Sequence, residues 1–450
     1  IADRFDLRRN IKFNTRVTTA RFIEDTNRWE VETDQGDRVT AQYLITGIGC
    51  ISAGNIPDIK GLETFEGENY HTGAWPHNEV DFTGKRVAVI GTGSSGIQSI
   101  PVIAKQAESL TVFQRTPQYT IPARHETVDR KFLDEQVKPN YEEILEKARW
   151  SKAGFPVEFS ERLALEATAE ERQEAYEAGW AKGGHGFLWG SFKDIGVDRR
   201  ANDTAAEFIR AKIREIVKDP ETVEKLLPTD HPLGSKRALI DTNYFETYNR
   251  ENVELVDIRH SPIQEITPDG IRTEDEDFEF DMIVFATGFD AMTGSFFKMD
   301  IRGRDNLSLK DKWAEGPKTY LGLQVAGFPN MFMITGPGSP SVLANMTVAI
   351  EQHQDWITDF IEHMRTHDIE VAEADADAES AWVSHVNKIA ESTMFMLADS
   401  WYLGANIPGK PRVFMPYVGG LGTYREKCNE VADNDYEGFV LNAGVRQLAT

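Results

Sequence analysis

Three glycines, Gly91, Gly93 and Gly96, form a GxGxxG pattern directly after the apolar run RVAVI. In such a pattern the first glycine permits a tight turn, the second lets the backbone approach a pyrophosphate, and the third lets a helix pack on the strand. The pyrophosphate would lie at the helix N-terminus, where free N–H groups point toward it. The strand before the motif, the helix after it and a second strand downstream favour this function over a glycine turn without a ligand. The predicted dinucleotide loop is Gly91, Thr92, Gly93, Ser94, Ser95 and Gly96.

The second strand of this unit ends in VFQRTP and indicates which dinucleotide is bound. An NAD site usually places an acidic residue here to hold the ribose 2′-hydroxyl. Gln114 stands near that position, and Arg115 and Thr116 follow it. A guanidinium and a hydroxyl suit a 2′-phosphate, so the sequence favours NADP over NAD. The alternative is that Arg115 is an ordinary surface arginine.

The rest of the chain shows the pattern of an α/β protein. Residues 11–50 alternate as strands around the turn DQGD and end in YLITGIG, which we expect to be a buried strand. Helical spacing and mixed charge dominate residues 129–230, where Asp219 before Pro220 predicts a helix start. Strand patterns return in NVELVD and DFEFDMIVFATGFD, and the last third mixes the strand MFMITGPG with helices such as VAIEQHQDWITDFIEHM.

Length and composition narrow the class of protein. The 450 residues predict two or three domains, and the formal net charge of −24 argues against a nucleic-acid-binding protein. Two distant cysteines, Cys50 and Cys428, favour a reduced, cytoplasmic protein without a cysteine zinc site. No apolar run is long enough to predict a membrane span. We expect no metal site, since His363 and His367 lack the glutamate of a zincin motif, and we expect DADAESAW to be a solvated acidic helix start.

A second strand end points to a second dinucleotide. VFATGFD ends in small residues that permit close approach to a cofactor, and YLITGIG is a weaker copy of the same pattern. Two such strands with a single phosphate loop suggest a protein built for two dinucleotides.

A longer pattern precedes the phosphate loop. Phe65, Gly67, His71, Trp75 and Pro76 match FxGxxxHxxxWP, the fingerprint of Baeyer–Villiger monooxygenases. The chain also resembles this family in GTGSSGIQ, VFQRTP, GSKR, ATGFDAMTG, GPGSPS and SWYLGANIPGKPRVFMPYVGG. The resemblance covers essentially the whole chain and is greatest to the phenylacetone, steroid and cyclohexanone monooxygenase branch.

This resemblance implies two Rossmann-like dinucleotide-binding domains with a helical insertion. The implied division is 1–52 and 290–450 for FAD, 53–128 and 231–289 for NADP, and 129–230 for the insertion. The first FAD βαβ unit of the family, with its own GxGxxG, has no counterpart in this sequence, so we expect a family member without that unit. The fingerprint residues Phe65, Gly67, His71 and Trp75 would form a linker between the domains. His71 would be a conformational hub there and not a base; the alternative is a well-packed loop with a satisfied histidine.

The family reaction converts ketones to esters or lactones. NADPH reduces FAD, the flavin traps O2 as a C4a-peroxide, and this peroxide attacks the ketone carbonyl. By resemblance, Arg237 stabilises the anionic peroxide and adduct, and Lys236 helps to hold the 2′-phosphate of NADPH. Without the resemblance, these two residues would be a plain basic surface pair.

The resemblance also assigns residues around the flavin. Trp401 would lie near the nicotinamide and the substrate, and the loop 335–346 would lie along the flavin. In that loop Pro337 and Met346 would touch the isoalloxazine, and Ser341, Val342 and Leu343 would line the ketone pocket. Trp401 and Met346 as simple core residues are the alternatives.

Two other functions stay open. One is a related flavin monooxygenase that oxygenates nitrogen or sulfur, and the other is an inactive fragment that binds NADPH without FAD. We expect a monomer or a homodimer that acts on a small ketone with O2.

Overall fold

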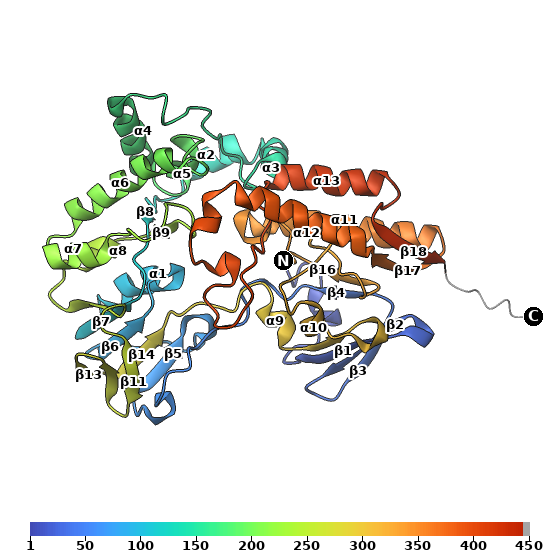
Figure 1. Ribbon diagram of the computed structural model, residues 1–450, viewed down its shortest axis with the longest axis horizontal. Coiled ribbons are helices and arrows are strands. Elements are labelled where there is room, and N and C mark those ends of the chain that lie inside the picture. Colours follow the sequence, from blue (N-terminus) through green and yellow to red (C-terminus); the bar gives the residue numbers. More distant parts are fainter. Residues whose placement is uncertain (444–450) are drawn as a thin grey trace, which may run out of the picture.

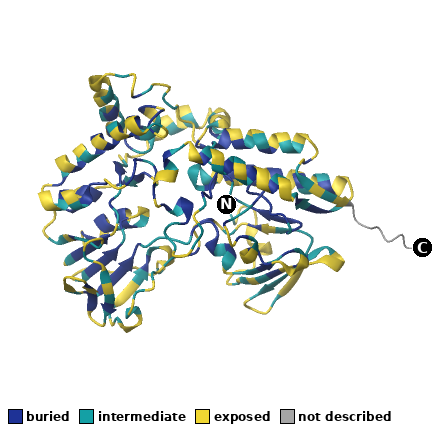
Figure 2. Cartoon of the chain, in the orientation of Figure 1, coloured by how far each residue is buried: buried dark blue, intermediate teal, exposed yellow. Residues whose placement is uncertain are grey.

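A five-stranded parallel sheet forms one half of the computed structural model, which describes residues 1–443 (Figure 1). Its strand order is β10-β7-β6-β14-β5. The strands are β5 (Glu68–His71), β6 (Arg86–Ile90), β7 (Ser109–Gln114), β10 (Val253–Asp257) and β14 (Met282–Phe285). The three central strands are rich in valine, isoleucine and phenylalanine and are almost wholly buried, as expected for parallel strands covered on both faces (Figure 2).

Helix α1 (Ser94–Ile103) follows β6 and covers one face of this sheet. The expected strand, glycine turn and helix around the GxGxxG motif are therefore confirmed. The opposite face is covered by an antiparallel sheet of β11 (Ile263–Thr267), β12 (Gly270–Thr273) and β13 (Asp277–Glu279). Ile271 of β12 and Phe280, which follows β13, pack in one core with Phe113 and Phe285.

Residues 129–230 are helical, as the sequence predicts. They contain α2 (Arg130–Phe132), a π-helical turn (Leu133–Val137), α3 (Tyr141–Trp150), α4 (Ala169–Lys182), α5 (Gly186–Gly190), α6 (Arg199–Ile216) and α7 (Pro220–Leu226). Asp219 caps α7 as expected, since its carboxylate accepts from the Thr222 N–H at 2.8 Å. Phe208, Ile209 and Ile213 of α6 share one hydrophobic core with Ile97 and Ile100 of α1. The helices of residues 129–230 therefore pack directly on the five-stranded parallel sheet.

A second lobe lies beside the first (Figure 1). It begins with a sheet ordered β15-β1-β2-β3, formed by β15 (Asp300–Arg302), β1 (Val17–Ile23), β2 (Arg28–Thr33) and β3 (Arg38–Ala41). The turn DQGD joins β2 to β3 as expected. Helices α11 (Met346–Thr366), α12 (Ala376–Glu391) and α13 (Leu421–Asp433) pack nearby, with β17 (Ile369–Ala374) and β18 (Phe439–Ala443) paired antiparallel. In this lobe β4 (Leu44–Thr46) also pairs parallel with β16 (Met331–Met333), and α9 (Gly294–Phe297) and α10 (Leu309–Lys312) are short helices. The parallel pair β8 (Thr120–Pro122) and β9 (Leu239–Asp241) and the short helix α8 (Tyr244–Thr247) belong to the core of the first lobe.

Two sequence expectations about burial are wrong. YLITGIG is not a buried strand, because β4 pairs with β16 along one edge and Ile45 is 49% exposed. DADAESAW does begin α12 with Asp375 as the cap, but it is not wholly solvated. Glu379 is 2% exposed and accepts from Lys312 at 2.8 Å and from the Ala326 N–H at 2.9 Å. These two partners explain why a carboxylate of an acidic run is buried.

Candidate functional site

The three glycines of the phosphate loop differ in how much space a side chain would have at each position. A Cβ on Gly91, whose φ is +107°, would lie 2.6 Å from the Ala286 carbonyl oxygen, and one on Gly96 would lie 2.2 Å from the Gly91 carbonyl oxygen. Packing therefore requires both glycines. A Cβ on Gly93 would meet no atom within 4 Å, so the second glycine opens onto free space at the start of α1. Ser94 and Ser95 form the first turn of that helix, where a pyrophosphate would bind.

Arg115, Thr116 and Lys236, which are far apart in sequence, line one cavity of about 590 Å³. Thr92 of the phosphate loop joins this region, because its hydroxyl donates to the Thr116 carbonyl at 3.1 Å. We call this space the phosphate cavity. Its full lining is Arg115, Thr116, Asp230, His231, Lys236, Arg259, Met396, Leu397, Ala398, Asp399, Ala405 and Arg412.

Cations outnumber anions in the phosphate cavity, although the whole chain is strongly acidic. Burial lowers the pKa of the Lys236 ammonium; Asp230 opposes this shift, and the Arg115 guanidinium adds to it. The His231 ring, which lies 2.6 Å from the Asp230 carboxylate, lowers the pKa of that carboxyl. A bound phosphate would relieve the repulsion between the clustered cations, so the cavity suits a 2′-phosphate.

Sequence reasoning missed two of these cations, Arg259 and Arg412. Arg259 follows β10, and β10 pairs with β7 so that Asp257 lies beside Gln114. The carboxyl ends of neighbouring parallel strands meet at one edge, so the strand order would have placed Arg259 near Arg115. Gln114 itself is fully buried and donates to the Lys225 carbonyl at 2.7 Å, so it takes no part in the cavity.

Arg237 points away from the phosphate cavity toward a different environment. Its guanidinium donates to the Val342 carbonyl at 3.0 Å. Burial raises the pKa of the Tyr402 hydroxyl, and the Arg237 guanidinium nearby opposes this shift. Burial likewise raises the pKa of the Cys50 thiol, against the influence of Ser341 and Arg237. Arg237 is thus the cation at the border of a largely apolar region.

This region brings several predicted residues together. Val342, Met346 and Trp401 pack against a buried group that the sequence did not reveal, and we call the whole set the apolar cluster: Cys50, Ala291, Met292, Val342, Met346, Trp401 and Met415. Leu343 lies next to it, packed with Trp401 and Tyr402. Ser341 is fully buried, and its hydroxyl lies 3.7 Å from the Met292 sulfur. Both Ser341 and Met292 have left-handed backbones, with φ of 42° and 66°. Strain of this kind persists where the surroundings fix the chain, and it gathers at functional sites.

The loop that carries Trp401 is tied to the end of β14. Lys410 donates to the Asp290 carboxylate at 2.6 Å and to the Ala291 carbonyl at 2.7 Å, and Asn406 donates to the Phe289 carbonyl at 2.8 Å. The Ser400 hydroxyl and the Asn406 amide oxygen are buried without a hydrogen-bond partner among the described residues. Orphaned polar atoms beside Trp401 suit a polar ligand at this loop.

Pro337 and Met346 lie at the two ends of one loop. The Pro337 carbonyl accepts from the Thr319 hydroxyl at 2.6 Å, and Pro337 is buried outside the apolar cluster. Met346 is the first residue of α11, which has 21 residues. The positive end of this long helix therefore faces the cluster, which suits an electron-rich ring system.

The fingerprint segment contains a neutral histidine, His71. The Gly73 N–H donates to His71 Nδ1 at 3.0 Å, so Nε2 carries the proton and donates to the Gly288 carbonyl at 3.1 Å. Burial lowers the pKa of His71, which favours this neutral form. A Cβ on Gly67 would lie 2.5 Å from both the Asp281 carbonyl oxygen and the Phe65 ring. Trp75 is 39% exposed and packs against Tyr70 and Phe82. His71 is therefore a buried, satisfied histidine bound to the chain just after β14.

Comparison with known proteins identifies the family. A family model described as "Flavin-binding monooxygenase-like" matches residues 1–128. A Baeyer–Villiger monooxygenase of Pseudooceanicola batsensis is 46% identical over 442 residues, which cover 98% of this chain and 80% of that protein. This chain belongs to the Baeyer–Villiger monooxygenase family. Other relatives of the family are cyclohexanone 1,2-monooxygenase of an Acinetobacter species (43% identical; 98% and 80% covered) and phenazine N-monooxygenase PhzNO1 of Lysobacter antibioticus (43%; 98% and 81%).

Solved structures of the family match the whole fold. Oxidised steroid monooxygenase bound to NADP aligns with a TM-score of 0.92 at 50% identity, over 98% of this chain and 83% of that one. OTEMO in complex with FAD and NADP aligns with a TM-score of 0.94 at 42% identity, over the same shares of the two chains. The α/β architecture and the predicted family are therefore confirmed, whereas the expected lack of a first FAD-binding unit is not.

Two further findings, on membrane-spanning helices and on metal sites, apply only to the part of the chain that the structure describes. Within residues 1–443, no helix combines the length and the apolar character that crossing a bilayer requires. Over the same part of the chain, no three histidine, cysteine or acidic side chains gather as a metal site would need.

Proposed function

We propose that this chain binds FAD and NADPH and uses O2 to convert a ketone to an ester or lactone. The observation that carries this proposal is the arrangement of two neighbouring residues. Lys236 lines the phosphate cavity, while Arg237 donates to the carbonyl of Val342 at the apolar cluster. Two consecutive residues thus connect the nucleotide-binding cavity to the place where oxygen transfer would occur.

NADPH binds along the edge of the parallel sheet. The pyrophosphate lies at the start of α1, beside the open space over Gly93. Arg115, Thr116 and Lys236 hold the 2′-phosphate in the phosphate cavity, with Arg259 and Arg412 as further cations. Trp401 contacts the other end of the nucleotide or the substrate, together with the Ser400 hydroxyl and the Asn406 amide oxygen, which have no hydrogen-bond partner among residues 1–443. The loop that carries these residues reaches both the apolar cluster and the phosphate cavity.

FAD, when bound, supplies the redox chemistry and the activation of O2. Pro337 and Met346 contact its ring system, and Ser341, Val342 and Leu343 line the ketone pocket. A guanidinium is a permanent cation in proteins, so Arg237 stabilises negative charge that develops on the substrate oxygen. Arg237 is an exposed residue that contacts the apolar cluster through the Val342 carbonyl.

The fingerprint segment couples the two lobes. His71 and Asn55 both bind the Gly288 carbonyl, through the ring Nε2 at 3.1 Å and the backbone N–H at 2.9 Å. Phe289 packs edge-on against His71 at 5.8 Å. We infer that His71 is a hub that transmits movement between the five-stranded parallel sheet and the second lobe. We also infer the division of the chain into domains: FAD is held by residues 1–52 and 290–450, NADP is held by residues 53–128 and 231–289, and residues 129–230 form an insertion. Cytoplasmic location and a monomeric or dimeric state stay predictions.

A second candidate is the oxygenation of a ring nitrogen. It is favoured by the relative named phenazine N-monooxygenase, which is 43% identical to this chain. The same cation and the same apolar surroundings serve both reactions, so the products must separate them.

The test is a product analysis of the FAD-loaded enzyme with NADPH and O2. Cyclohexanone should give its lactone, measured by gas chromatography, faster than phenazine gives an N-oxide. Faster N-oxide formation would favour the second candidate. Oxidation of NADPH with neither product, or failure to retain FAD, would overturn both.

A further inference from the structure

We propose that Asn202, in the helical segment, is a positioning residue for Lys236 and Arg237. This inference rests on the proposed function, since it concerns the same two cations. Asn202 belongs to α6 and lies 34 residues before Lys236, and it does not line the phosphate cavity. Its role is to hold the turn 232–235 that leads directly into both cations.

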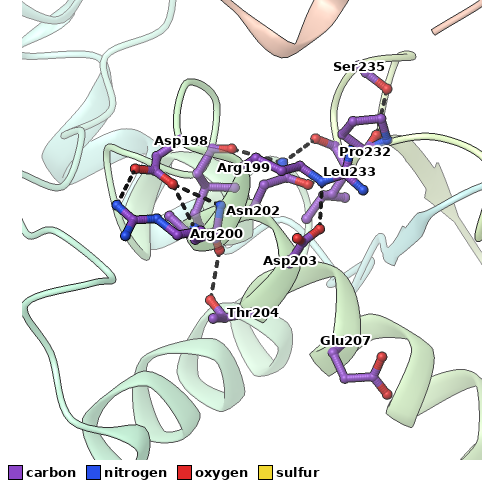
Figure 3. A network of polar contacts seen from close by, with 12 residues as sticks. Asp198, Arg199, Arg200, Asn202, Asp203, Thr204, Glu207, Pro232, Leu233 and Ser235 are labelled. Carbon is purple, nitrogen blue, oxygen red and sulfur yellow. Dashed lines mark hydrogen bonds and ion pairs between the residues drawn. The ribbon is translucent and has the colours of Figure 1, made fainter. Parts of the chain in front are cut away.

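The Asn202 side chain pairs with this turn as a strand residue would (Figure 3). Its amide nitrogen donates to the Leu233 carbonyl at 2.7 Å, and its amide oxygen accepts from the Leu233 N–H at 3.0 Å. The same nitrogen also donates to the Ile195 carbonyl at 2.8 Å. The side chain therefore links three backbone groups outside α6 to this helix.

These contacts are shielded from water. Asn202 is fully buried, and Leu233 and Ile195 are 1% and 3% exposed. A buried hydrogen bond of this kind is costly to remove, because the unpaired backbone groups have no water to replace the lost partner. Only asparagine has both a donor and an acceptor at this length, so it fixes the direction of the turn as well as its distance.

The Leu233 side chain also packs in the core shared by α1 and α6, while the hydrogen bonds of Ser235 are internal to the turn. The Ser235 hydroxyl donates to the Pro232 carbonyl at 2.6 Å, and the Ser235 N–H donates to the same oxygen at 3.2 Å. Both bonds are internal, so they shape the turn without attaching it to another element. Asn202 anchors this shaped turn to the helix.

The helix end that carries Asn202 is itself held rigidly. Asp198 caps α6, and its carboxylate accepts from the Arg200 N–H at 2.8 Å while its carbonyl accepts from the Asn202 N–H at 2.9 Å (Figure 3). Phe208 and Ile209 further along α6 lie in the core shared with the parallel sheet. The path from the sheet through α6 to Leu233 therefore gives Lys236 a fixed position relative to Arg115.

The test measures the binding of adenosine 2′,5′-bisphosphate and of AMP to the FAD-loaded enzyme by calorimetry. The two probes differ by the 2′-phosphate alone. Asn202→Ala should weaken the bisphosphate about tenfold and AMP less than twofold, because only the 2′-phosphate depends on Lys236. Ser235→Ala disturbs the turn less and should change the same ratio about threefold.

Asn330 is a matched control. It is also fully buried, and its amide donates to the Glu370 carbonyl at 2.9 Å and accepts from the Ala372 N–H at 2.8 Å. It lies in the other lobe, beside β16 and β17. Asn330→Ala should lower the Tm at least as much as Asn202→Ala, since Asn330 also has a left-handed backbone with φ of 54°. It should leave the ratio of the two probes unchanged.

Lys236→Ala separates the failure of this inference from the failure of the proposed function. If Lys236→Ala lowers the bisphosphate preference but folded Asn202→Ala does not, the positioning role is overturned. If Asn202→Ala does not fold, an unchanged ratio in Ser235→Ala overturns it instead. If Lys236→Ala itself leaves the ratio unchanged, the assignment of the 2′-phosphate to this cavity is wrong.

Discussion

Lys236 and Arg237 are neighbours in sequence, yet they serve two regions built in opposite ways. The phosphate cavity collects cations and leaves them open to solvent or to a ligand. At the apolar cluster Arg237 donates to the Val342 carbonyl and lies near the Tyr402 hydroxyl, beside largely apolar side chains. In the phosphate cavity several cations stabilise the same phosphate, whereas at the border of the apolar region Arg237 provides most of the stabilisation of the developing negative charge. The two regions should therefore respond very differently to the loss of one cation.

The backbones of the two regions differ as well. The phosphate cavity is built at the ends of β7 and β10, where regular strands fix the positions of Arg115 and Arg259. The apolar cluster is built from loops, and two of its contacts come from the left-handed residues Met292 and Ser341. The regular strands position several cations that bind the nucleotide together, while the strained loops fix a single arrangement of the residues around the reacting groups.

The largest effect is expected from Arg237→Ala. Lys410 also contacts the apolar cluster but is paired with Asp290, so formation of the oxygenated product should fall by at least about 100-fold, equivalent to about 3 kcal/mol of barrier. Lactone from cyclohexanone is the measurement, and NADPH affinity should change by less than about twofold. Arg199→Ala, which removes a surface ion pair of α6 with Asp203, is the control and should leave product formation unchanged. A normal lactone yield from Arg237→Ala would remove the distinction between the two regions.

The support of the apolar region should also add a pH dependence to stability. His353 in α11 is fully buried and accepts from the Thr335 N–H at 2.9 Å, at the start of the loop 335–346. Burial lowers the pKa of His353 from 6.5 to about 3. The unfolded chain takes up this proton below about pH 6.5 and the folded chain does not, so acid favours unfolding over that range. At pH 5 the loss should be about 2 kcal/mol relative to neutral pH.

His353→Asn is the variant that isolates this effect, because it keeps a hydrogen-bond acceptor and cannot be protonated. Denaturant unfolding at pH 7 and pH 5 should show a smaller loss of unfolding free energy in the variant than in the parent. Equal losses in both proteins would mean that His353 is not the group that titrates.

The phosphate cavity is built on regular strands and the apolar cluster on loops, and this difference explains how well the sequence predicts each region. The GxGxxG loop and Arg115 follow regular strands, so local pattern and the strand–turn–helix rule suffice to find them. Arg259 needed the strand order, which depends on the pairing of β10 with β7 across more than 130 residues of intervening chain. Residues of the apolar cluster come from five separate loops or helix ends, and only resemblance to a family brings Val342, Met346 and Trp401 together in advance.

The burial of polar groups is the feature that local sequence predicts least well. Glu379 looked solvated because it lies in an acidic run, and its partner Lys312 lies 67 residues earlier. Asn202 carried no signal at all, since one asparagine in a charged helix is unremarkable until its side chain meets Leu233. Long-range pairing of this kind is absent from local pattern, whether the pair is an ion pair or an amide against a backbone.

Arg115→Ala tests the shared grip of the phosphate cavity. Since Lys236, Arg259 and Arg412 remain, NADPH binding should weaken about tenfold and not be abolished, while NADH binding changes by less than about twofold. Steady-state KM values for the two nucleotides measure this. The loss should shrink at high salt, because the charges are open to solvent. Equal weakening of NADPH and NADH would show that Arg115 does not contact the 2′-phosphate.

The smallest effect is expected from Arg412→Ala, in the lining of the same cavity. Arg412 is paired with Asp399, and the two side chains are 55% and 72% exposed, so much of its charge is already neutralised and screened. Removing it should raise the KM for NADPH about two- to threefold and leave product formation at saturating NADPH unchanged. Asp399→Ala is the informative partner, because it frees Arg412 and should lower the same KM slightly. If Arg412→Ala instead stopped product formation as Arg237→Ala does, the loop from Ser400 to Arg412 would belong to the chemistry, and the two regions would form one site.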